Sequence, residues 1–94
     1  MAEIGEKWPT ASIRDFADHI DHAVQVAGID HVGISSDFDS GGGIVGWNNT
    51  GETFNVTLEL VRRGYTEAQI AKLWSGNVLR VWAENTRLAR QLRP

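Results

Sequence analysis

The sequence has no cysteine, only two prolines and no long hydrophobic run. Without cysteine, neither a disulfide framework nor a thiolate zinc site can reinforce the fold, so its stability must come from packing. The apolar runs are far shorter than the roughly 20 residues that a membrane helix needs, and residues 1–12 lack the apolar core of a signal peptide. We therefore expect no membrane segment in this chain and, by default, a cytoplasmic, reducing setting.

What is present is an ordinary globular composition. The 94 residues are 41% hydrophobic and 22% charged, which excludes disordered and collagen-like classes and allows one small domain at most. A chain of this length buries only about two-thirds of the surface that its unfolded form exposes. The core must therefore be thin.

The charge is distributed unevenly along the chain. Residues 1–60 hold ten acidic residues against two basic ones, whereas residues 61–94 hold seven basic residues against two acidic ones. The basic residues are spread over helical positions without interleaved aromatics or a recognisable binding motif. We interpret them as a solvated helical face that partly neutralises the acidic half, and we predict no nucleic-acid partner.

Capping motifs and apolar periodicity predict four helices. Capping-box spacings at Ser12–Asp15 and Thr66–Gln69 each precede an apolar stripe, and Gly28 ends the first of these helices. Gly76 is expected to break the third helix, and Asn77 is expected to cap the last one. The expected helices cover residues 12–27, 52–63, 66–74 and 77–94.

One strand is predicted, at residues 31–35, followed by a loop that contains three consecutive glycines. A lone strand cannot satisfy its backbone N–H and C=O groups, and the only other candidate, Ile44-Val45, lies between glycines. A buried strand between helices is typical of a β/α unit in a parallel sheet. We infer that residues 1–94 are a partial domain, either a piece of a larger α/β protein or an obligate oligomer.

The predicted strand has two unlike faces, because alternate residues of an extended segment point the same way. The face expected to meet the helices holds Val32, Ile34 and Ser36. The opposite face is small or polar and holds His31, Gly33, Ser35 and Asp37. Its last residue, Asp37, lies at the carboxyl end of the strand, where (β/α)₈ barrels place catalytic groups. An aspartate after a strand can equally be a turn former or a helix cap, and the pattern alone leaves both interpretations open.

Ordered motifs along most of the chain resemble those of one enzyme family. They are Asp18-His-Ile-Asp-His22, the segment 26–34, Ser36-Asp-Phe-Asp39, Leu60-Val-Arg-Arg-Gly-Tyr-Thr66 and Gly76-Asn-Val-Leu-Arg80. Over about residues 12–84 the sequence resembles the C-terminal end of the membrane (renal) dipeptidase family. The resemblance implies a metallohydrolase of the amidohydrolase superfamily with a dipeptide substrate and two zinc ions. It also implies an α/β fold in which this chain supplies the last strand and surrounding helices of a (β/α)₈ TIM-type barrel.

The same resemblance locates one site residue in the chain. The metal ligands of the family, an early His-x-Asp, a bridging Glu and two later His, precede the matched region, so the resemblance places no metal ligand here. Asp37 matches the aspartate that ends the last strand, which implies substrate binding and proton transfer in the intact enzyme. Asp39 is interpreted as a loop-shaping acid that accepts backbone hydrogen bonds. We expect the isolated chain to be inactive and to need the missing N-terminal barrel segment, or to self-associate.

Other notable side chains have simpler interpretations. His19 and His22 have the helical i, i+3 spacing of a metal pair, but they lie beside or away from the apolar stripe, so we interpret them as solvated. Trp47 either lines a substrate pocket or anchors the loop. The tryptophans on apolar helix faces are expected in the core, and they are Trp74 and Trp82.

Two function hypotheses remain. The first is the C-terminal segment of a zinc dipeptidase, inactive in isolation. The second is a small non-catalytic protein or interaction module, which pairs its exposed strand edge or its apolar helix faces with a partner.

Overall fold

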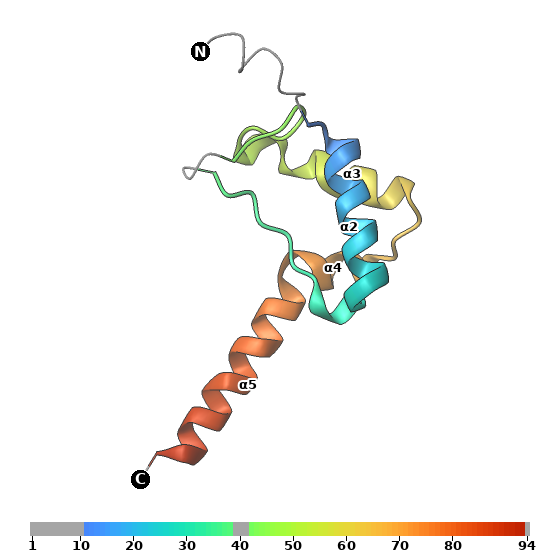
Figure 1. Cartoon of the computed structure of the whole chain (residues 1–94). Coiled ribbons are helices and arrows are strands. Elements are labelled where there is room, and N and C mark those ends of the chain that lie inside the picture. Colours follow the sequence, from blue (N-terminus) through green and yellow to red (C-terminus); the bar gives the residue numbers. More distant parts are fainter. Residues whose placement is uncertain (1–10, 39–41, 94) are drawn as a thin grey trace.

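The computed structural model describes residues 11–38 and 42–93, and these residues are mostly helical (Figure 1). In this described part of the chain, four α-helices are joined by two short 3₁₀ turns and one π-helical turn. The elements in chain order are α2 (Ile13–Ala27), η1 (Ile29–His31), η2 (Thr50–Glu52), α3 (Thr53–Arg62), α4 (Glu67–Ala71), the π turn η3 (Lys72–Gly76) and α5 (Asn77–Leu92). Helices are therefore confirmed in the four expected regions, with the last one ending at Leu92; residue 94 lies outside the described residues.

Both predicted capping boxes are formed. The Ser12 hydroxyl accepts a hydrogen bond from the Asp15 backbone N–H at the start of α2, and the Asp15 carboxylate accepts one from the Ser12 N–H at 3.0 Å. Thr66 and Gln69 make the same reciprocal pair at the start of α4. Each box satisfies backbone donors that the first turn of a helix leaves unpaired, which fixes where these helices begin.

The core lies where α2, α3 and the α4–η3 segment meet. Val56, Leu60 and Leu73 are fully buried, and the other buried apolar residues are Ala17, Ile20, Trp47 and Ile70. The apolar periodicity of α2 and α3 brings one stripe of each helix to this contact. These three elements thus enclose a small core.

The predicted break at Gly76 is wrong, because the helix continues through it. Gly76 has helical dihedral angles (φ −57°, ψ −45°), and so does Asn77, which is therefore an interior residue rather than a cap. The π turn widens the helix here, and a Cβ on Gly76 would lie only 3.2 Å from the Ala71 carbonyl oxygen. Glycine at this position leaves room for the Ala71 carbonyl in the widened turn, and it does not end the helix.

The central strand predicted at residues 31–35 is not formed. His31 belongs to the turn η1, and the residues from Val32 to Asp37 run as a chain without strand partners in the described part of the protein. The only paired positions outside helices there are isolated bridges, Ser12 with Val45 and Ile44 with Trp47. A strand is defined by hydrogen bonds to a neighbour, and the described residues supply no second strand beside this segment.

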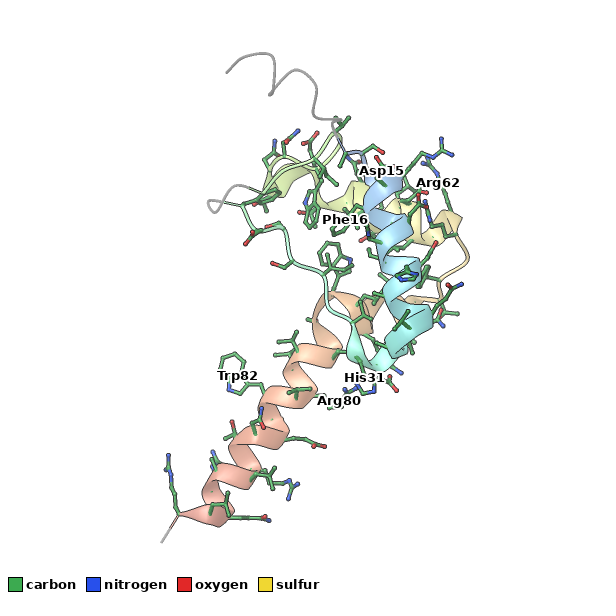
Figure 2. The ribbon with its side chains drawn as sticks, viewed as in Figure 1. Asp15, Phe16, His31, Arg62, Arg80 and Trp82 are labelled. Carbon is green, nitrogen blue, oxygen red and sulfur yellow. The ribbon has the colours of Figure 1, made fainter. Side chains whose placement is uncertain are left out.

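Helix α5 projects away from the rest of the molecule (Figure 1), and much of its apolar surface is uncovered. The expectation that Trp82 is a core residue is wrong: its side chain is 68% exposed and points away from the helical body (Figure 2). Trp74, one helical segment earlier, is half-buried and packs against the core. The Cα radius of gyration is 16.6 Å, whereas a compact domain of this length has about 12 Å. Among the described residues, no helix has the length and apolar character needed to cross a membrane.

Candidate functional site

The extended segment 32–37 retains the two-faced character that its sequence predicts. Val32 and Ile34 are half-buried and pack against the core, while Gly33, Ser35 and Asp37 are exposed. The apolar face meets the helices, as expected. The small and polar face is open to solvent and ends at Asp37.

Helix residues hold the buried side of this segment in place. The Ile34 N–H donates to the Leu73 carbonyl at 2.9 Å. The Asn77 side-chain amide donates to the carbonyls of Ile29 and Val32, at 2.7 and 2.8 Å. Asn77 is only 4% exposed, so these two bonds explain why a polar residue lies in the interior. Sequence reasoning missed this role, because it placed Asn77 at a helix end.

Asp37 has an unusual backbone conformation. Its φ angle is 57°, and it is the one non-glycine residue with positive φ in the described part of the chain. Its carbonyl accepts a hydrogen bond from the Gly42 N–H at 2.9 Å, and the next N–H, of Phe38, donates to the Ser36 hydroxyl at 3.2 Å. Aspartate is among the few residues that tolerate this left-handed region, where the chain turns sharply. Asp39 lies outside the described residues, so its predicted role stays a prediction.

Aromatic packing fixes the chain on either side of this turn. The Trp47 ring makes edge-to-face contacts with Phe16, Phe38 and Trp74, at centroid distances of 5.4, 5.4 and 5.8 Å. Trp47 is 4% exposed, and its indole N–H donates to the Thr53 hydroxyl at 3.1 Å. Of the two roles considered for Trp47, the structure therefore favours the loop anchor. The Phe38 ring ties the residue after Asp37 to the core.

The Arg-Arg-Gly-Tyr-Thr motif docks the α3–α4 junction on α2. The Arg63 guanidinium contacts the carboxylates of Asp18, Asp21 and Glu59 at 2.9, 2.6 and 2.9 Å, which raises the pKa of Arg63. The Tyr65 hydroxyl donates to Asp21 at 2.6 Å. This network was not predicted, although the i, i+4 spacing of Glu59 and Arg63 could have indicated one of its pairs.

The pKa values of two further groups in this network are also shifted. Burial alone would raise the pKa of the Asp21 carboxyl, but the hydrogen bonds from Tyr65 and Arg63 outweigh it and hold that pKa below its usual value. Burial, assisted by the hydrogen bond to the Asp21 carboxylate, raises the pKa of Tyr65 to about 12. The network thus favours an ionised Asp21 and a neutral Tyr65. Both side chains serve to hold the α3–α4 junction against α2.

The described residues do not fit a zinc site. Residues 11–38 and 42–93 contain no group of three or more His, Asp or Glu side chains placed to hold a metal ion. His19 and His22 are exposed on α2, in agreement with their interpretation as solvated residues. The candidate site is therefore a single carboxylate, Asp37, at the end of an open polar face.

Comparison with known proteins settles the family. A family model described as membrane dipeptidase (peptidase family M19) matches residues 4–94. The chain belongs to the membrane dipeptidase family. The resemblance read from the sequence motifs is thereby confirmed.

The similar proteins are much longer than this chain. It is 40% identical over 84 residues to an uncharacterized dipeptidase of Schizosaccharomyces pombe and 36% identical over 83 residues to the dipeptidase aclJ of Aspergillus oryzae, in each case covering 87% of this chain and 20% of the relative. The crystal structure of the probable dipeptidase PvdM from Pseudomonas aeruginosa matches 86% of this chain and 20% of its own, with 54% identity and a TM-score of 0.80. The chain thus spans about a fifth of the length of these relatives.

Proposed function

We propose that this chain is the C-terminal segment of a zinc-dependent dipeptidase with a (β/α)₈ barrel, and that Asp37 works at the mouth of that barrel. The observation that carries the proposal is the position of Asp37 within a dipeptidase-family segment. It ends an extended run with one packed and one open face, as the last strand of a barrel would. Neighbouring strands from the rest of the barrel would pair with this run and convert it into a true strand.

Asp37 has the chemistry that dipeptide hydrolysis requires near the substrate. An exposed carboxylate can accept hydrogen bonds from the protonated amino end of a dipeptide and can carry a proton to the leaving amine. Its left-handed backbone turns the chain at the end of the open face, at the point where the chain enters a loop. This supports one residue that both binds substrate and transfers a proton.

The zinc ions of this proposal belong to the part of the barrel that lies outside this chain. The described residues do not fit a metal site, so no step of hydrolysis is assigned to a metal held here. The isolated chain is accordingly proposed to be inactive, because a single carboxylate has no activated nucleophile to assist.

A complementation assay tests the proposal. The 94-residue chain is purified alone and together with the N-terminal four-fifths of a dipeptidase relative, and dipeptide hydrolysis is measured with zinc present. We expect no turnover by the chain alone and measurable turnover on mixing, whereas an Asp37→Asn chain should restore little. Zinc-dependent hydrolysis by the chain alone would contradict the proposal.

A second candidate function rests on the uncovered surface of α5. Trp82 is 68% exposed and Leu92 is 83% exposed, which is typical of surfaces that meet a partner. An interaction module or a self-associating small protein would use this face directly. Sizing of the purified chain separates the candidates: an interaction module forms a defined dimer that survives dilution, whereas a barrel segment associates without fixed stoichiometry.

A further inference from the structure

The loop after Asp37 contains a glycine position that leaves no room for a side chain. The Gly42 N–H donates to the Asp37 carbonyl at an N···O distance of 2.9 Å. A Cβ on Gly42 would lie 2.6 Å from that same oxygen and would collide more severely with the Ser36 carbonyl oxygen. Any other residue at position 42 must therefore displace either the loop or residues 36 and 37.

The backbone conformation of Asp37 benefits from such a contact. Aspartate tolerates a φ of 57° better than most residues, but this conformation still costs free energy, so contacts from its surroundings stabilise it. The other described residues with positive φ are glycines, which need no such support. The Gly42 N–H is the group that engages the Asp37 carbonyl directly.

A second set of contacts acts on the same peptide unit, because the Asp37 carbonyl and the Phe38 N–H lie in one plane. The Phe38 ring packs edge-to-face on the buried Trp47 ring at 5.4 Å, and the Phe38 N–H donates to the Ser36 hydroxyl. The peptide after Asp37 is thus attached to the core. Among the described residues, Gly42 is the one whose N–H reaches the Asp37 carbonyl itself, from the far side of the loop.

We propose that Gly42 is a positioning residue for Asp37. Because it lacks a Cβ, its N–H reaches the Asp37 carbonyl and holds residue 37 in the left-handed conformation that directs its carboxylate out of the open face. The consequence for catalysis rests on the proposed function, since the direction of the carboxylate matters to turnover only if Asp37 works at a substrate site. The conformational part of the proposal stands without it.

The conformational part is tested by NMR on the 94-residue chain. A positive φ shortens the distance between the amide and α protons of one residue, so Asp37 should show a strong intraresidue NOE in the unaltered chain. We expect Gly42→Ala to lose this NOE, while the indole resonances of Trp47 and Trp74 still report a packed core. Gly33→Ala is the matched control, because its Cβ would meet Val78 at an ordinary 3.5 Å, and it should keep the NOE.

A second variant covers the case in which Gly42→Ala fails to fold. Replacing the peptide bond before Gly42 by an ester, in chain made by chemical ligation, removes the N–H donor and adds no Cβ. Loss of the Asp37 NOE in this ester supports the proposal. Absence of the NOE in the unaltered chain, or its survival in a folded Gly42→Ala chain or in the ester, overturns it.

The functional part is tested in the full-length enzyme by a double-mutant cycle. Gly42→Ala should lower kcat/KM by at least tenfold, through kcat and KM together because Asp37 both binds the substrate and transfers the proton, and it should cause no further loss in the Asp37→Asn background. General structural damage would instead lower kcat/KM by the same factor in both backgrounds, and that result overturns the proposal. If Asp37→Asn alone leaves kcat unchanged, the proposed function fails, and the NMR result still decides whether Gly42 sets the Asp37 conformation.

Discussion

Two regions of the folded molecule differ sharply in how completely they are packed: the packed end, made of α2, α3 and α4, and the open end, made of α5 and the segment 32–37. Helices α2, α3 and α4 bury Val56, Leu60 and Leu73 fully and enclose an aromatic cluster around Trp47. Helix α5 and the segment 32–37 instead leave apolar side chains or one open face uncovered. The packed end has its partners within the chain, whereas the open end has side chains and backbone groups suited to partners from outside it. Under the proposed function, the rest of the barrel would pack against the open end.

The largest expected effect is a loss of catalytic activity when Asp37, in the open end, is replaced. In a full-length dipeptidase relative, replacing the aspartate that matches Asp37 by Asn keeps the size of the side chain but removes its proton acceptor, so under the proposed function kcat should fall by about 10²–10⁴-fold. Steady-state kinetics with zinc content measured in parallel provide the check, and zinc content should not change. Asp39→Asn, two residues further on, should cost much less, and equal losses for both variants would remove the distinction between site residue and loop residue.

The stability of the chain should depend on the packed end. Leu60→Ala removes a fully buried side chain and should cost about 2–5 kcal/mol, enough to unfold a marginal domain. Leu92→Ala, at a position 83% exposed, should change stability by less than about 0.5 kcal/mol. Urea unfolding followed by circular dichroism measures both. Similar costs for the two variants would mean that α5 is buried in solution, for instance by self-association.

A smaller effect is expected where Arg63 joins the packed helices. Arg63→Met removes charge-assisted hydrogen bonds to three carboxylates and leaves them crowded together, so we expect a loss of about 1–3 kcal/mol. Its neighbour provides the matched control. The Arg62 side chain is 67% exposed and lies 3.8 Å from Glu59, so Arg62→Met should cost about 0.5 kcal/mol or less. Equal effects in urea unfolding would show that the Arg63 network contributes nothing specific.

Features that depend on neighbouring residues in the sequence could be predicted. The capping boxes at Ser12 and Thr66 are complete within four residues, so the start of α2 and α4 follows from local chemistry. The alternation of packed and open residues over 32–37 also follows from sequence, because an extended backbone imposes it whether or not a partner strand is present.

Features that depend on distant residues could not be predicted in the same way. Residues 31–35 look like a strand, yet a strand needs a neighbour that the described residues do not provide. The local pattern predicts a cap at Asn77, because it carries no sign of the buried hydrogen bonds that Asn77 makes to Ile29 and Val32, 48 and 45 positions away. Trp82 has an apolar, helical pattern around it, but periodicity does not tell whether anything covers that face. For the site, the family motifs indicate Asp37, whereas the contact from Gly42 depends on how the chain folds back on itself, which no local motif reports.

The smallest expected effect is a change in the pH dependence of stability. Tyr65 has a pKa of about 12 in the folded chain, against about 10 for an unperturbed tyrosine. A raised pKa in the folded state means that its stabilising contribution is complete below about pH 10 and is lost as the pH rises toward 12. Asp21 has a lowered pKa, so its contribution is present above about pH 4 and is lost as the pH falls through the lowered value.

Tyr65→Phe removes the hydrogen bond that links these two titrations. Relative to the unaltered chain, the variant should be less stable by about 0.5–1.5 kcal/mol at neutral pH, and the difference should shrink between about pH 10 and 12, where the unaltered chain loses the contribution of Tyr65. The acid-side loss should also become smaller, because one of the two groups that lower the pKa of Asp21 is gone. Urea midpoints of both chains across the pH range measure this difference directly, and subtraction cancels the titration of other groups. A difference that stays constant from pH 7 to 12 would show that Tyr65 stabilises the packed end by contact alone, without its hydrogen bond to Asp21.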